Sequence, residues 1–109
     1  MVSSVAFLLL GMAGVATAEP FPCGDRGTCA ENLIELNVRL GPSLPEPVMS
    51  RAPQGKWMAL HCWTYGDVVH GDSVRYHITW VSSFDGHSGY VAGYYVDTGP
   101  DPAPGIPRC

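Results

Sequence analysis

The fold is decided by a short alternating stretch of sequence, Ile34-Glu35-Leu36-Asn37-Val38-Arg39. Apolar and polar side chains take turns along it, and successive side chains of a β-strand point to opposite faces of the sheet. The stretch therefore predicts a half-buried strand whose core-facing side chains are Ile34, Leu36 and Val38. A proline-rich loop follows, and then a second short strand at residues 48–51, which the Pro53-Gln54-Gly55 turn closes.

Further strands are predicted downstream. Residues 56–64 place Met58, Leu60 and Cys62 on one face, and the opposite face carries Trp57, Ala59, His61 and Trp63. Two Gly-Asp turn signals lie between residues 65 and 72. The stretch 75–81 then alternates again, and its inward side chains are Tyr76, Ile78 and Trp80.

A hairpin turn is predicted at Asp85-Gly86, followed by short strands at residues 88–91 and 94–96. About five short strands separated by turn residues are typical of an all-β domain. We expect a small, partly open β-barrel.

The amino terminus has the features of a secretion signal. Residues 5–15 are apolar and uncharged, and Ala16-Thr17-Ala18 matches an A-x-A cleavage site. Because the run is shorter than the roughly 20 apolar residues that span a bilayer, we expect no permanent membrane anchor. The sequence predicts a signal peptide at residues 1–18 and a secreted product, extracellular or associated with the cell wall. A buried core helix is the alternative for this segment.

All four cysteines lie after residue 18, and an even number is typical of a small domain stapled in an oxidising compartment. The sequence alone leaves every pairing open. The Gly-rich segment between Cys23 and Cys29 is suited to closing on itself, so we favour that disulfide, with Cys62 bonded to Cys109. The predicted organisation is an N-terminal extension with a short disulfide loop (19–32), the barrel (33–98) and a proline-rich tail (99–109).

Three segments together resemble a bacterial SH3-type (SH3b) domain of the short secreted kind. They are Leu36–Ser43, similar to the family's L-N-V-R-x-G-P-S; Pro47–Met49 with the turn at 53–55; and Trp80 with residues 85–96, similar to W…G-x-x-G-Y-V-x-x-x-Y-V. Their order and spacing are kept over residues 33–98. The resemblance implies an SH3-like barrel that acts as a binding module for cell-wall peptide or peptidoglycan.

One predicted strand carries aromatic side chains at positions where that family usually has Lys, Thr or Gln. The candidate ligand-binding residues are Trp57, His61, Trp63 and the neighbouring Tyr65. Exposed aromatic rings are suited to stacking against a sugar ring or a peptide. In the alternative interpretation, the N-terminal extension or the proline-rich tail packs over these rings, and their role is structural.

Composition and motifs disfavour other classes of function. The net charge is −4 and the six basic residues are scattered, which argues against a nucleic-acid partner. The cysteines and histidines lack C-x-x-C and H-x-x-x-H spacing, so we expect no metal and no cofactor. Because Gly86-His87-Ser88-Gly89 departs from a nucleophile elbow and the carboxylates show no paired placement, we expect no catalytic residues.

The sequence thus predicts a secreted, non-catalytic SH3-like module that binds peptidoglycan, a peptide or another exported protein. The alternative is a small extracellular structural or inhibitory protein that binds a protein partner and has no affinity for the wall. Binding to wall material that depends on the aromatic residues would distinguish the two.

Overall fold

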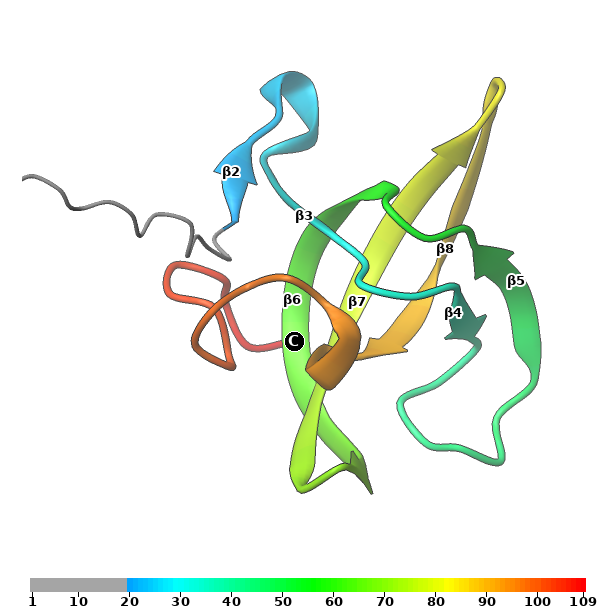
Figure 1. Cartoon of the computed structure of the whole chain (residues 1–109), viewed down its shortest axis with the longest axis vertical. Coiled ribbons are helices and arrows are strands. Elements are labelled where there is room, and N and C mark those ends of the chain that lie inside the picture. Colours follow the sequence, from blue (N-terminus) through cyan, green and yellow to red (C-terminus); the bar gives the residue numbers. More distant parts are fainter. Residues whose placement is uncertain (1–19) are drawn as a thin grey trace, which may run out of the picture.

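The computed structural model describes residues 20–109 (Figure 1). The predicted signal peptide, residues 1–18, lies outside these residues. The described chain is all-β, as predicted, apart from short 3-10 turns at Gly24–Arg26 and Gly93–Tyr95. No helix in this part of the chain is long and apolar enough to cross a membrane.

Residues 20–109 form one antiparallel sheet of seven strands in the order β2-β3-β6-β7-β8-β4-β5. The strands are Phe21–Pro22 (β2), Thr28–Glu31 (β3), Leu36–Arg39 (β4), Val48–Ala52 (β5), Trp57–Val69 (β6), Asp72–Ser82 (β7) and Asp85–Ala92 (β8). The expectation of about five strands was wrong, because β2 has only two residues and β3 buries two adjacent side chains, so neither shows an alternating pattern. The expected strand at residues 94–96 is instead largely the 3-10 turn at Gly93–Tyr95. The sheet is also not closed into a barrel, since β2 and β5 are its two edges.

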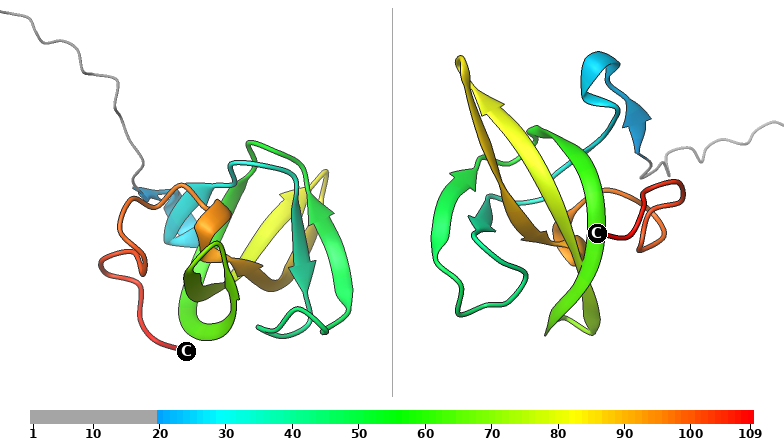
Figure 2. Two further views of the ribbon diagram at one scale, coloured as in Figure 1. Left: turned by 60° about the horizontal axis from the view of Figure 1, so that its bottom comes forward. Right: turned by 180° about the vertical axis from the view of Figure 1, so that it is seen from behind.

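The long strands β6, β7 and β8 cross the molecule side by side, and the other segments lie around them (Figures 1 and 2). Strands β4 and β5 curl away on one side. The carboxyl-terminal tail runs beside β6 on the other side, where Arg108 forms a parallel bridge with Trp63. The tail therefore lies against the sheet over its last residues.

The core is built on the inward face of β7. Tyr76 and Ile78 are fully buried and Trp80 is nearly so, which confirms the predicted alternation of this strand. They pack in one cluster with Val38 of β4 and Met58 of β6. Burying a large apolar side chain stabilises the fold by about 1.5–3 kcal/mol, so this cluster is a major source of stability.

The first predicted strand begins later than expected. Leu36 and Val38 are buried as predicted, but Ile34 is 43% exposed and precedes β4. The buried side-chain amide of Asn32 donates hydrogen bonds to the carbonyl oxygens of Ile34 at 2.9 Å and Pro53 at 2.7 Å. These bonds hold a bend between β3 and β4, so the prediction that Ile34 faces the core was wrong.

The alternation of β6 changes face at an irregularity between Leu60 and Cys62. Leu60 pairs with Ile78, but after the extra residue His61 the next pairs are Cys62 with His77 and Trp63 with Tyr76. Trp63 therefore packs against the core, and Cys62 lies on the opposite face with His77. The predicted inward Cys62 and outward Trp63 were wrong, because a β-bulge reverses the sides of all later residues.

The turn signal at Gly66-Asp67 does not mark a turn, because β6 continues to Val69 and turns at His70 and Gly71, whose φ angles are 50° and 83°. A side chain at Gly66 would overlap the carbonyl oxygen of Pro42. Glycine is needed at that position for the close approach of the loop between β4 and β5.

The second hairpin turn is displaced from Asp85-Gly86, because Ser82 pairs with Asp85 and leaves Ser83 and Phe84 as the loop. The buried pair of Tyr76 with Val91 sets this register. Burial of Tyr76 and Val91 in this register stabilises the hairpin more than a turn at Asp85-Gly86 would.

Candidate functional site

Both predicted disulfides are present. Cys23 is bonded to Cys29, and Cys62 is bonded to Cys109. The first closes a loop of exposed residues beside β2, and the second attaches the end of the chain to β6. Two disulfide-bonded pairs are consistent with an oxidising, extracellular environment.

At the start of β6, Trp57 is 57% exposed and forms an aromatic pair with Phe21 of β2. The ring centroids are 5.1 Å apart and the rings meet edge to face. The indole Nε1 donates a hydrogen bond of 3.1 Å to Glu31 Oε2 on β3. This predicted site residue is therefore oriented by the two N-terminal strands while more than half of its surface stays exposed.

Further along β6, the tail contacts a second aromatic pair. The rings of Trp63 and Tyr65 meet edge to face with centroids 5.2 Å apart. The guanidinium carbon of Arg108 lies 4.9 Å from the Trp63 centroid and 4.8 Å from that of Tyr65. The backbone of Trp63 also accepts a hydrogen bond from Cys109 N (2.8 Å) and donates one to Pro107 O (3.0 Å). These contacts fit the structural interpretation of this pair.

The predicted residues do not form one platform. At about 3.3 Å per residue, Trp57 lies roughly 20 Å from Trp63 along the strand. The structure brings Trp63 and Tyr65 together and places Trp57 beside Phe21.

His61 belongs to a polar cluster on the outer face of the sheet. Its Nε2 lies 2.8 Å from Thr79 Oγ1, which is 2.7 Å from Ser88 Oγ. The ring of His77 lies 5.5 Å from that of His61 and 4.9 Å from that of Tyr90. Burial, and then the neighbouring charge of His61, lower the pKa of His77. Both effects favour the neutral ring of His77.

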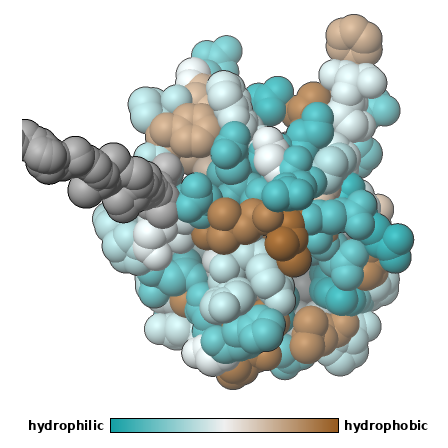
Figure 3. All heavy atoms as spheres, viewed as in Figure 1, coloured by the Kyte–Doolittle hydropathy of each residue, from teal (hydrophilic) through white to brown (hydrophobic). Residues whose placement is uncertain are grey.

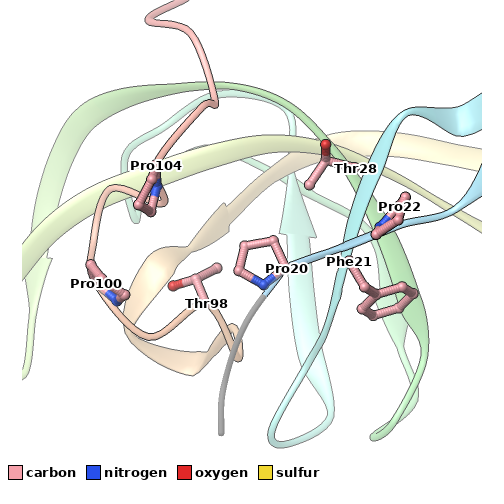
Figure 4. A pocket seen from close by; sticks show the side chains of 7 residues that line it. All are labelled: Pro20, Phe21, Pro22, Thr28, Thr98, Pro100 and Pro104. Atoms are coloured by element: carbon pink, nitrogen blue, oxygen red, sulfur yellow. The ribbon is translucent and has the colours of Figure 1, made fainter.

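A groove of about 420 Å³ separates β2 from the proline-rich tail (Figure 4). One side is formed by residues 20–22 and Thr28, and the other by Thr98, Pro100 and Pro104. Each side has its own disulfide, since Cys23–Cys29 follows β2 and Cys62–Cys109 ends the tail. Proline and disulfide constraints together give the groove stiff walls.

The tail side of the groove is fastened by a buried tyrosine. The Tyr76 hydroxyl donates to Asp101 Oδ1 and accepts a hydrogen bond of 2.8 Å from Ala103 N. Burial raises the pKa of Tyr76. Burial also raises the pKa of Asp101 to about 7, and the adjacent carboxyl group of Asp72 acts in the same direction. The hydroxyl and the carboxyl group thus hold residues 101–103 against β7.

Sequence reasoning missed several residues that shape these surfaces. Phe21 follows the predicted cleavage site, and its position beside Trp57 depends on the pairing of β2 with β3 and of β3 with β6. Arg108 precedes the terminal cysteine, and the expected Cys62–Cys109 bond was a signal that it would lie near β6. Among residues 20–109, no group of three or more His, Cys, Asp or Glu side chains is placed to hold a metal ion.

Comparison with protein-family models and with curated proteins finds no match for this chain.

Proposed function

We propose that this protein is an exported, non-catalytic SH3-like binding module that recognises peptide of the bacterial cell wall. The observation that carries the proposal is the groove between β2 and the tail, with its proline-lined walls and two threonines. Ligand sites are usually concave and mostly apolar, with a few polar groups that orient the ligand. The volume of about 420 Å³ suits a short peptide segment.

The aromatic pair extends this surface. Phe21 lines the groove and its ring also contacts that of Trp57, so this aromatic pair lies next to the groove. Aromatic rings contribute a large contact area at little cost in conformational entropy. The stiff walls reduce the ordering cost of binding still further. This geometry supports Trp57 as a binding residue and moves the proposed site away from Trp63 and Tyr65.

Co-sedimentation with purified peptidoglycan tests the proposal. Oxidised protein purified after secretion should bind saturably, and Trp57→Ala and Phe21→Ala should each weaken binding about tenfold, as expected for loss of an aromatic contact. Phe84→Ala is the matched control, because that ring is fully exposed at the tip of the β7–β8 hairpin. Absence of saturable binding, or an equal loss in the Phe84 variant, would contradict the proposal.

A protein partner is the second candidate, and the edge strand β5 favours it. Val48 and Met49 on this edge are 40% and 58% exposed. An edge strand offers unpaired backbone groups to which a partner strand can be added. If wall binding is absent, an exported protein that co-purifies with this chain, and is released by Met49→Lys, would support this function instead.

A further inference from the structure

The molecule contains a buried cation whose hydrogen-bonding groups are not all used. Arg75 of β7 is only 2% exposed, and its Nη2 donates a hydrogen bond of 3.0 Å to the carbonyl oxygen of Asp67. Its Nε is buried and has no hydrogen-bond acceptor among residues 20–109. Because a buried N–H without an acceptor destabilises a protein, this arginine needs an explanation beyond the packing of the sheet.

Arg75 lines a second cavity, of about 250 Å³, which is separate from the groove. Arg39 and Asn37 line it as well, and both belong to β4. Its apolar wall includes Ile34, Leu44 and Tyr95. The cavity thus combines two arginine residues with apolar ones.

Charges of both signs surround Arg75. Burial is the main cause of the lowered pKa of Arg75, and the positive charge of Arg39 adds to it. The negative charges of Asp67 and Asp72 act in the opposite direction. Both aspartates already accept backbone hydrogen bonds, Asp67 from Leu44 N at 2.7 Å and Asp72 from Val74 N at 2.9 Å.

Arg39 is held in place by the backbone of the loop between β4 and β5. Its Nη1 donates hydrogen bonds to the carbonyl oxygens of Leu44 at 2.8 Å and Glu46 at 3.1 Å. These bonds use one of the nitrogens of the guanidinium group. An anion between Arg39 and Arg75 would relieve the repulsion between the two cations.

We propose that this cavity binds the C-terminal carboxylate of a peptide that ends in an aliphatic residue. A carboxylate presents two oxygens in the geometry that a guanidinium group matches, and Arg39 and Arg75 both line the cavity. The volume is below the roughly 300 Å³ of sites that enclose a whole small ligand, which fits the end of a chain. The proposal goes beyond the proposed function and does not depend on the groove.

Two features favour a carboxylate on an apolar group over a phosphate. Ile34 and Leu44 are 43% and 45% exposed, so an aliphatic side chain would bury apolar surface there. Figure 3 shows apolar surface where the chain between β3 and β4 crosses this face. Glu35 also lines the cavity, and it would repel a doubly charged phosphate more than a singly charged carboxylate.

Titration with the dipeptide N-acetyl-glycyl-leucine tests the proposal, with its C-terminal amide as the matched probe. Calorimetry should give a dissociation constant for the acid roughly tenfold to a hundredfold lower than for the amide, since charge-assisted hydrogen bonds are lost with the carboxylate. In backbone NMR spectra the acid should shift the signals of residues 34–37, 69, 75 and 95, which line the cavity. Equal affinity for acid and amide would overturn the proposal.

Variants locate the binding. Arg75→Gln should weaken binding of the acid at least about tenfold. Arg26→Gln, in the exposed loop closed by Cys23–Cys29, is the charge-matched control and should leave the affinity unchanged. Glu35→Gln should tighten binding of the acid and leave the amide unaffected. If Arg75→Gln does not fold, the proposal is still tested by the Glu35 variant and by comparing the affinities of the unmodified protein for the acid and the amide. Competition by inorganic phosphate at the same concentration as the acid would overturn the peptide assignment.

Discussion

The N-terminal loop and the C-terminal tail are each closed by a disulfide, but they are attached to the molecule in different ways. The loop residues Gly24–Arg26 are not buried, and the backbone hydrogen bonds between Cys23, Gly24 and Gly27 stay within the loop. The tail instead buries Ala103 and Ile106 in the main core. One crosslink closes a local turn, whereas the other secures a segment that also packs against the core.

This difference separates two uses of a disulfide. In the loop, the bonded cysteines are six positions apart, so the bond restricts little of the unfolded chain. In the tail, the bonded cysteines are 47 positions apart, and the bond restricts much more of the unfolded chain. The tail should consequently contribute more to global stability, and the loop should mainly determine the shape of one wall of the groove.

The largest effect is expected from removing the tail disulfide. Replacing Cys62 and Cys109 together by Ser should lower the free energy of unfolding by about 4 kcal/mol, from the chain-entropy relation for this loop length. Denaturant unfolding of the variant and the parent protein measures the change. A loss below that of the N-terminal pair would contradict the comparison.

Removing the loop disulfide should lower the free energy of unfolding by a smaller amount. The double change Cys23→Ser and Cys29→Ser is expected to lower the free energy of unfolding by about 2 kcal/mol, because the closed loop is short. Hydrogen exchange should show faster exchange confined to residues 21–29, with β7 and β8 unchanged. Faster exchange throughout the sheet would show that the loop is not a local element.

A smaller effect is expected from Tyr76→Phe, which tests the packing of the tail separately from its disulfide. The change removes the hydrogen bonds to Asp101 and Ala103 and should lower the free energy of unfolding by about 1.5 kcal/mol. Tyr90→Phe, on the outer face next to His77, is the control and should have little effect. If both variants lose the same amount, the hydroxyl of Tyr76 does not fasten the tail.

A further effect concerns pH. Asp101 has a pKa raised from 3.8 to about 7 by burial, so the folded state binds its proton more tightly than the unfolded state. This contribution is complete below about pH 4 and is lost as the pH rises through about 7. The melting temperature should therefore decrease over that range, and Asp101→Asn should remove the decrease.

Histidine provides the control for this pH dependence. The lowered pKa of His77 acts in the opposite sense, because its contribution to stability is present above 6.5 and is lost as the pH falls through its folded value. Comparing Asp101→Asn with His77→Gln separates the two contributions. An unchanged pH profile in Asp101→Asn would rule out the carboxyl group as its source.

Much of the fold follows from the sequence because alternation reports which side chains a strand buries. Tyr76, Ile78 and Trp80 alternate with polar residues and are all buried. The candidate site was less predictable. Trp57 and Trp63 are six positions apart, which would place them on one face of a regular strand, but the bulge at His61 turns Trp63 to the core.

The all-β class, the buried face of β7 and the paired cysteines were determined by the sequence itself. The first two depend on the local alternation of apolar and polar residues, and the third depends on the even number of cysteines. Both can be read directly from the sequence. Only the tertiary structure decided the bulge in β6, the groove between β2 and the tail, and the burial of Arg75. These features arise where segments distant in the chain meet, and their packing energies outweigh the local preferences of turns and strands.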